Sequence, residues 1–235
     1  MGEMMDKSSK QIRKLFDDIT PTYDLLNHLL SMSVDKGWRK RTLAELSIVE
    51  TDRVLDIATG TGDLAISARM AKNCPLVGLD LSRGMLMEAV RKWSQAFEGD
   101  SFQAVQGDAL SIPFGDGTFD KAMVAFGVRN MPDIGGFLDE AHRVLRTPGR
   151  LAILEFSTPT NPFFRQIYLL YLTKILPFIG GLRSGNRAAY KYLSDSIQEF
   201  PSPPVLCQIF EEHGFKVIKS IPLTMGICYL HILEK

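Results

Sequence analysis

Short apolar runs alternate with longer amphipathic stretches along the chain from Arg53 onward. A short apolar run bounded by polar residues is typical of a buried strand, whereas apolar residues that recur every three or four positions indicate a helix. Strands are therefore predicted at 54–57, 76–79, 102–105, 119–125 and 151–156. Helices are predicted at 62–71, at 82–96 with Ser82 as the N-cap, and at 137–145. Strands that are separated by helices imply right-handed crossovers and a parallel sheet.

The two ends of the chain depart from this alternation. Residues 1–50 carry apolar side chains at helical spacing, which predicts a helical N-terminal cap ahead of an α/β domain at 51–235. Residues 158–200 form an apolar insertion without a strand–helix–strand unit. Two further strands are predicted at 215–221 and 227–233. They are too close in sequence for a crossover helix, so they should pair antiparallel.

The composition is that of an ordinary globular protein, with 235 residues, 45% hydrophobic residues and a formal net charge of zero. Without a basic field, we expect no nucleic-acid partner. The three cysteines form no CxxC pair, which favours a reducing, cytoplasmic setting. The N-terminus lacks the features of a secretory signal, and no apolar run predicts a membrane span. The four histidines lack metal-ligand spacing, so no metal is predicted.

The segment from Val54 to Asp63 carries the strongest chemical signal. A buried strand leads into a turn with Gly60 and Gly62, and a helix begins directly afterwards. Glycine lets a ligand approach the backbone, and the free N–H groups of a helix N-terminus suit a phosphate. Asp56 and Asp63 would repel a phosphate here, so the pattern favours a cationic ligand, S-adenosylmethionine. The alternative for Asp63 is a simple helix cap.

Acidic residues lie at the ends of three successive predicted strands, at Asp56, Asp80 and Asp108. Ligands of doubly wound sheets bind at the carboxyl ends of the strands, so we expect these side chains to line one site. Asp80 lies 20 residues after Gly60, a spacing suited to a carboxylate that accepts from ribose hydroxyls. Asp108 is expected to accept from the adenine amino group, the Ala109 N–H to donate to the ring, and Asp56 to hold the methionine ammonium.

The glycine turn leaves other interpretations open. Residues 60–65 also satisfy the dinucleotide pattern GxGxx(G/A), which would make the chain a NAD-dependent oxidoreductase. The carboxylate of Asp56 beside the turn disfavours that alternative. A different small-molecule methyltransferase on the same scaffold is a further alternative, as is a module that binds S-adenosylmethionine without catalysis. The oligomeric state stays open.

Longer motifs carry a resemblance to a known family. DIATGTGD at 56–63, GLD at 78–80 and GDALSIPF at 107–114 resemble class I S-adenosylmethionine-dependent methyltransferases. A narrower resemblance, to the ubiquinone/menaquinone biosynthesis C-methyltransferases, rests on YDLLN at 23–27, FGVRN at 126–130, LEFS at 154–157, YKYLSDSI at 190–197 and LTMGI at 223–227. The resemblance covers nearly the whole chain from about Phe16.

This resemblance implies a Rossmann-like α/β fold, with a seven-stranded, mostly parallel sheet whose last strand is antiparallel. It also implies C-methylation of a polyprenyl quinol, most directly demethylmenaquinol in menaquinone biosynthesis, with a benzoquinol of ubiquinone biosynthesis as the alternative. By similarity, the cofactor contacts are Thr61, Asp80, Asp108 and Ala109, in addition to Asp56 and the two glycines of the turn.

The chemistry of such a reaction points to further residues. The methyl group of a sulfonium is already activated, so the protein mainly has to align the reactants. A quinol ring carbon becomes nucleophilic when a neighbouring phenol loses its proton. Arg129 is the first candidate for stabilising the phenolate, with Asn130 as an orienting donor. The alternative for Arg129 is an ion pair with an acid near the end of the sheet.

Three residues near the N-terminus are candidates for closing over the site as substrate-binding groups: Tyr23, Asp24 and Asn27. Their alternative is a helix start capped by Asp24. The sequence also departs from the family pattern. Asp35 stands where the family usually has His, and Arg-Thr-Pro-Gly at 146–149 replaces Lys-Pro-Gly-Gly. Ala125 stands where some members have a Ser that touches the cofactor, so that contact is not expected here.

Two surface features suggest a peripheral membrane contact. The segment 163–179 is unusually apolar and is interrupted by Arg165 and Lys174. It fits a lid that meets an isoprenoid tail or the inner face of a membrane, or else a helix packed on the core. The basic residues of 36–41 fit anionic headgroups or a plain solvated face. These basic residues are Lys36, Arg39, Lys40 and Arg41.

Overall fold

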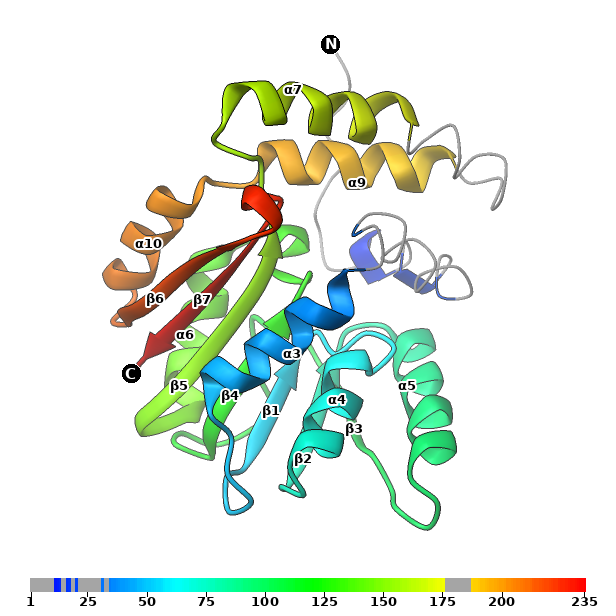
Figure 1. Ribbon diagram of the computed structural model, residues 1–235. Coiled ribbons are helices and arrows are strands. Elements are labelled where there is room, and N and C mark those ends of the chain that lie inside the picture. The colour runs from blue at the N-terminus through cyan, green and yellow to red at the C-terminus, as the bar shows by residue number, and fades with distance from the viewer. Residues whose placement is uncertain (1–10, 14–15, 18–19, 21–30, 32–33, 176–186) are drawn as a thin grey trace.

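The computed structural model describes residues 11–13, 16–17, 20, 31, 34–175 and 187–235. A seven-stranded sheet in the order β3-β2-β1-β4-β5-β7-β6 runs through the middle of the molecule (Figure 1). Its strands are β1 Val54–Ile57, β2 Leu76–Asp80, β3 Gln103–Gln106, β4 Phe119–Ala125, β5 Leu145–Phe156, β6 Lys216–Leu223 and β7 Cys228–Glu234.

The first five strands pair parallel with their neighbours, whereas β7 pairs antiparallel with both β5 and β6. Only a short 3₁₀ turn, η4 Thr224–Gly226, connects β6 to β7. The structure thereby confirms the predicted fold class, with a mostly parallel sheet of seven strands and an antiparallel last strand.

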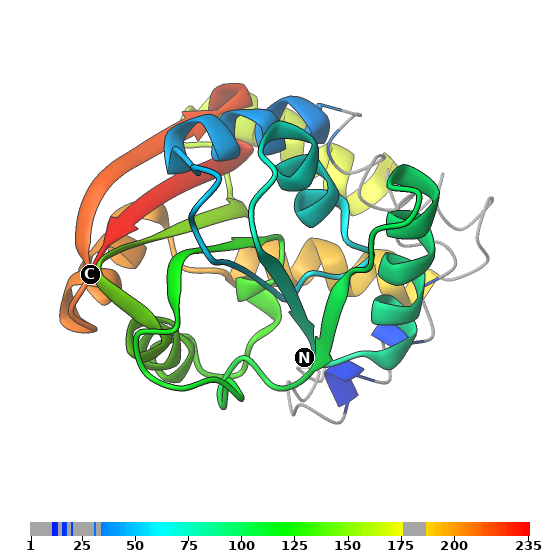
Figure 2. The same cartoon turned by 90° about the horizontal axis from the view of Figure 1, so that it is seen from below.

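Helices cover both faces of the sheet (Figure 2). On one face pack α3 Asp35–Leu46, α4 Asp63–Ala71 and α5 Arg83–Ala96, and on the other α6 Ile134–Val144 and α10 Pro203–Glu212. Ser82 caps α5 by accepting a hydrogen bond from the Met85 N–H at 3.1 Å, as the sequence predicts. Because both faces are covered, all four residues of β1 are buried, the three apolar ones and also the carboxyl of Asp56.

The insertion lies across the carboxyl edge of the sheet (Figure 1). It contains α7 Pro162–Leu170, which continues into the short π-helix η3 Tyr171–Ile175, and then α9 Arg187–Glu199. Asn161 caps α7 by accepting from the Phe164 N–H at 3.1 Å. Among the described residues, no helix is long and apolar enough to cross a membrane.

One strand boundary differs from the sequence prediction by more than two residues. β5 begins at Leu145, directly after α6 and six residues before the predicted start at Leu151. Leu145 pairs with Phe119 of β4, and the register shifts between Phe119 and Lys121. Residues 146–148 are exposed, so this part of the strand lacks the apolar signal that identified the rest.

The helix α3 is fixed over the ends of β4 and β5 by aromatic packing. The rings of Phe126 and Phe156, which lie at the ends of these strands, stack at 4.5 Å, and the Trp38 ring lies 5.9 Å from that of Phe156. The Trp38 indole donates a hydrogen bond to Thr224 Oγ1 at 2.9 Å. The predicted division into a cap at 1–50 and a domain at 51–235 stays a prediction, because most residues before 34 lie outside the described part of the chain.

Candidate active site

The strand order reverses between β1 and β4, the place where doubly wound sheets bind their ligands. The backbone is unusual just beyond both strands. Ala58 and Phe126 have positive φ values of 51° and 60°, a conformation that non-glycine residues seldom adopt. A Cβ on Gly127 would lie 2.8 Å from the Ala58 Cβ, so the two loops are in close contact. Such strain clusters at functional sites, which makes this edge the candidate site.

The glycine turn after β1 depends on both of its glycines. Gly60 and Gly62 have φ values of 57° and 83°. A Cβ on Gly62 would also lie 3.0 Å from the Ala89 Cβ of α5, so a side chain there would press the turn away from the helix. Gly62 is the N-cap residue of α4, so the alternative that Asp63 caps this helix is wrong. The turn therefore brings its backbone close to any ligand between β1 and β2.

Asp80, at the end of β2, is bonded to this turn. Its Oδ2 accepts from the Gly60 N–H at 2.8 Å, and its Oδ1 accepts from the Ser82 N–H at 2.8 Å. Burial raises the pKa of Asp80 to about 6, although these two bonds oppose the change. A carboxylate has about four acceptor sites, so ligand hydroxyls can still bond to it.

A first hollow is lined by five of the residues that the sequence predicts for the site, and two of them are Gly60 and Asp80. Asp108 lies there with its Oδ1 accepting from the Leu110 N–H at 3.0 Å, and Ala109 and Asn130 lie there too. Most of the remaining wall is apolar, which suits a flat ring system. It includes Phe16, Ala58, Leu79, Leu81, Met85, Phe126 and Met131.

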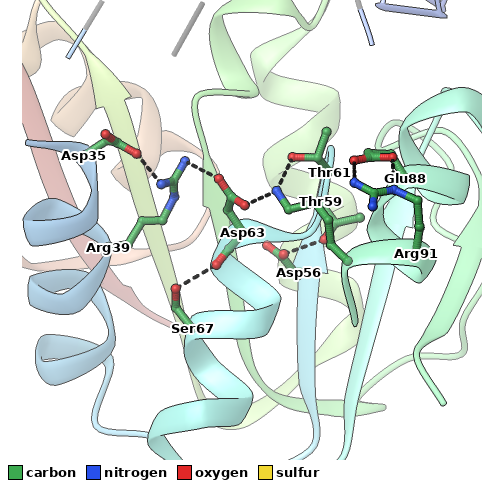
Figure 3. A network of polar contacts seen from close by, with 10 residues as sticks. Asp35, Arg39, Asp56, Thr59, Thr61, Asp63, Ser67, Glu88 and Arg91 are labelled. Atoms are coloured by element: carbon green, nitrogen blue, oxygen red, sulfur yellow. Dashed lines mark hydrogen bonds and ion pairs between the residues drawn. The ribbon is translucent and has the colours of Figure 1, made fainter. Parts of the chain in front are cut away.

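A second hollow shares Ala58 and Phe126 with the first and contains the buried carboxyl of Asp56. Asp56 Oδ2 accepts a hydrogen bond from Thr59 Oγ1 at 2.6 Å (Figure 3). Burial raises the pKa of Asp56 to about 7; the Thr59 bond opposes this shift, and the charge of Asp80 adds to it. Thr61 also lines this hollow, as does Ala125, which presents no hydroxyl.

Polar side chains link the second hollow to α3 (Figure 3). Arg39 binds Asp35 on its own helix and Asp63 of α4, and Lys92 of α5 binds the same Asp63. The side chain of Arg39 is only 6% exposed. The interpretation of 36–41 as one solvated basic face is therefore wrong for Arg39, although Lys36, Lys40 and Arg41 are exposed.

Arg129 and Asn130 lie on the 3₁₀ turn η2 Val128–Asn130 that follows β4. The guanidinium of Arg129 is buried and bonds to Glu155 Oε1 at 2.7 Å and to the Phe126 carbonyl at 2.5 Å. The ion pair that the sequence left as an alternative is thus present. Asn130 lines the first hollow, whereas Arg129 is not part of its wall.

Sequence reasoning missed Tyr192 as a site residue. Its hydroxyl donates to Asn130 Oδ1 at 2.9 Å, and Asn130 Nδ2 donates to the Phe126 carbonyl at 3.2 Å. Tyr192 belongs to α9, so the insertion holds the Asn130 amide in place. The only signal in the sequence was its place in the motif at 190–197.

Some predictions fall outside this geometry. Tyr23, Asp24 and Asn27 lie outside the described residues, so their predicted roles stay predictions. Within the described residues, no group of three His, Cys, Asp or Glu side chains is arranged to hold a metal ion.

Comparison with solved structures identifies the class of fold. A methyltransferase from Aquifex aeolicus described as S-adenosylmethionine-dependent has a TM-score of 0.61 at 17% identity, covering 83% of this chain and 88% of its own. The [4+2]-cyclase SpnF has a TM-score of 0.72 at 14% identity, covering 97% of this chain and 96% of its own. The fold is that of class I S-adenosylmethionine-dependent methyltransferases, and the cyclase shows that this fold alone does not fix the reaction.

Sequence comparison narrows the class to a family. Residues 4–235 match the ubiE/COQ5 methyltransferase family, and the chain belongs to that family. A relative from Geotalea uraniireducens, named ubiquinone/menaquinone biosynthesis C-methyltransferase, is 41% identical over the full length of both chains. A demethylmenaquinone methyltransferase from Thermus thermophilus is 42% identical, covering 94% of this chain and 100% of its own. This membership sets the NAD-dependent alternative aside, and the methyl donor is S-adenosylmethionine.

The raised pKa of Asp80 makes cofactor binding depend on pH. Ligand hydroxyls and a nearby cation favour the carboxylate, so binding should lower this pKa from about 6 and affinity should fall as the solution is acidified. When binding lowers the pKa of Asp80 by one unit, the affinity at about pH 5.5 is roughly threefold weaker than the affinity at pH 8. Calorimetry with S-adenosylhomocysteine is expected to show this loss.

The variant Asp80→Asn should bind roughly tenfold more weakly at pH 8, because a charge-assisted bond is lost, and should show a flatter pH dependence. Asp116→Asn is the matched control, because the Asp116 side chain is 83% exposed and lies outside both hollows. Wild-type affinity in Asp80→Asn would contradict the assignment of Asp80 to the ligand.

Proposed function

We propose that this chain methylates a ring carbon of a polyprenyl quinol, with demethylmenaquinol as the preferred substrate. The relatives named for this reaction support the proposal, and they align with this chain over almost its whole length. The observation that carries the chemistry is the pair of carboxyls at neighbouring strand ends, Asp56, which is buried, and Asp80, which is partly buried. Their pKa values are raised, and a cationic, hydroxyl-rich ligand would favour their charged forms.

The two hollows fit the two ends of S-adenosylmethionine. The apolar wall of the first suits adenine, with Asp108 and the Ala109 N–H at the ring edge and Asp80 at the ribose. The polar wall of the second suits the methionine portion, with Asp56 facing the ammonium. The backbone of Gly60, Thr61 and Gly62 would pass along the junction between them.

The sulfonium supplies an activated methyl group, so the work of the chain is to orient the quinol and favour its phenolate. Asn130 is the candidate for this role, because its amide is held from both sides and bonds to the carbonyl of Phe126, a residue that lines both cofactor hollows. Arg129 lies next to it and brings positive charge, which its pairing with Glu155 partly offsets. Tyr23, Asp24 and Asn27 would complete the substrate side.

Turnover with defined quinols tests the proposal. Purified protein with S-adenosylmethionine should convert demethylmenaquinol to a product heavier by one methyl group, measured by mass spectrometry. A demethylated benzoquinol with the same tail is the comparison substrate and should react more slowly. Faster reaction of the benzoquinol would move the assignment to the ubiquinone pathway, and turnover of neither quinol would refute the proposal.

Loss of the Asn130 amide should reduce catalysis far more than cofactor binding. Asn130→Ala is expected to lower kcat by about 100-fold, as for other orienting donors. Tyr192→Phe removes only the hydroxyl that holds this amide and should lower kcat by roughly tenfold, the value of one hydrogen bond. Because Asn130 also lines the first hollow, both variants should lose some affinity for S-adenosylhomocysteine, but by a much smaller factor. Equal losses in kcat and in that affinity would show that η2 serves only to support the cofactor site.

We also propose that α7 meets the membrane that holds the substrate. Phe163, Ile167 and Leu170 are 74%, 50% and 56% exposed and recur at helical spacing, so they form one apolar stripe. Arg165 and Lys174 are exposed near it, as suits an anionic surface. The helix α7 lies beyond the carboxyl edge of the sheet, the edge at which the site lies (Figure 1).

Vesicle flotation checks this contact. Replacing Phe163, Ile167 and Leu170 together with Ser should weaken binding to vesicles with anionic lipid at least about tenfold, because each apolar side chain that is buried in the membrane contributes roughly 1.5–3 kcal/mol. Met70→Ser with Met87→Ser is the matched control, since these side chains are also highly exposed, at 74% and 65%, but lie on α4 and α5. An equal loss in the control, or no flotation of the wild type, would contradict the contact.

A further inference from the structure

Arg39 places a buried positive charge in the wall of the second hollow, although it belongs to a helix that precedes the first strand. Asp35, one turn before it, binds one of its terminal nitrogens and in turn accepts from Ser31 Oγ at 2.9 Å. The other terminal nitrogen, Nη2, lies 3.3 Å from Asp63 Oδ2. Its guanidinium carbon also lies 5.9 Å from the centre of the Phe126 ring, in the wall that both hollows share.

Of the two ion pairs of Arg39, the one with Asp63 can be exchanged for a contact with a ligand. The contact with Asp63 is long for a charge-assisted hydrogen bond, which is usually about 2.7–2.9 Å. Asp63 is also bound by Lys92, so its charge stays compensated when Arg39 turns to another partner. Asp35 holds the opposite side of the guanidinium, which keeps the group in place during such an exchange.

The hollow thus carries both signs of charge, with Asp56 on one side and Arg39 on the other. The amino-acid end of a methionine has the same pattern, an ammonium beside a carboxylate. Arginine is suited to a carboxylate because its planar fork offers two parallel N–H donors. We propose that Arg39 binds the carboxylate of the methionine portion of the methyl donor, a role that rests on the proposed function and extends it to α3.

This assignment also implies a role for Asp35. This residue is fully buried against Arg39. An acidic partner fixes the guanidinium, so Asp35 acts as a positioning residue for the carboxylate site.

Ligands that differ only at the amino-acid end test the inference by calorimetry. The three probes are S-adenosylhomocysteine, its decarboxylated amine, and 5′-methylthioadenosine, which lacks both charged groups. Arg39→Met should lower the affinity for S-adenosylhomocysteine at least tenfold and change the affinities for the other two ligands by less than twofold. Arg39→Lys keeps a charge without the fork and should give an intermediate loss. Equal weakening of all three ligands would overturn the assignment.

Two controls distinguish the loss of this carboxylate contact from general damage to the binding site. Lys92→Met removes the other cation that binds Asp63 and should change the three affinities by one common factor. Arg39→Met leaves the buried charge of Asp35 without its cation. The affinities for the three ligands are therefore also compared between Asp35→Asn and the double variant Asp35→Asn/Arg39→Met. The selective loss of S-adenosylhomocysteine affinity should recur in the double variant. Its absence in that pair would also overturn the assignment. A wild-type chain that binds none of the probes would refute the proposed function itself.

Discussion

The site depends on the burial of two carboxyls at adjacent strand ends. Removing Asp56 and Asp80 from water disfavours their charged forms, and the neighbouring charge adds to the cost for Asp56. The backbone offsets part of this cost by directing N–H groups from Gly60 and Ser82 at Asp80. The Gly60 N–H reaches Asp80 from a turn in which Ala58, Gly60 and Gly62 all have positive φ, so the glycines and the strain at Ala58 serve this contact.

A second buried pair, Arg129 with Glu155, has a different character. Its side chains are 3% and 1% exposed and compensate one another, so removing either alone would leave an unpaired buried charge. Glu155 accepts from both the guanidinium and the backbone N–H of Arg129, and it therefore fixes η2 against β5. The FGVRN and LEFS motifs, which the sequence presents as separate, act as one unit that places Asn130.

The sequence was sufficient for features that depend on local chemistry. The strand at 54–57, the Ser82 cap, the antiparallel last strand and the gathering of Asp80, Asp108 and Ala109 in one hollow followed from periodicity and strand ends. It was insufficient where tertiary packing chooses between similar residues. Four basic residues occupy 36–41, and only the contact of α3 with Asp63 and Phe126 turns Arg39 inward. The four-residue spacing from Asp35 was the available signal.

The residues that would distinguish this chain from other proteins of its fold come from outside the shared sheet. Solved structures at 14–19% identity have the same fold, and one of them is a cyclase. In this chain α3 supplies Arg39 to the second hollow, and α9 supplies Tyr192 to Asn130. α3 packs on one face of the sheet and α9 lies at its carboxyl edge, and both supply side chains to the site without changing the sheet. Under the proposed function, the choice of reaction depends on the segment between β5 and α10, which supports Asn130 and can vary while the carboxylate site is kept.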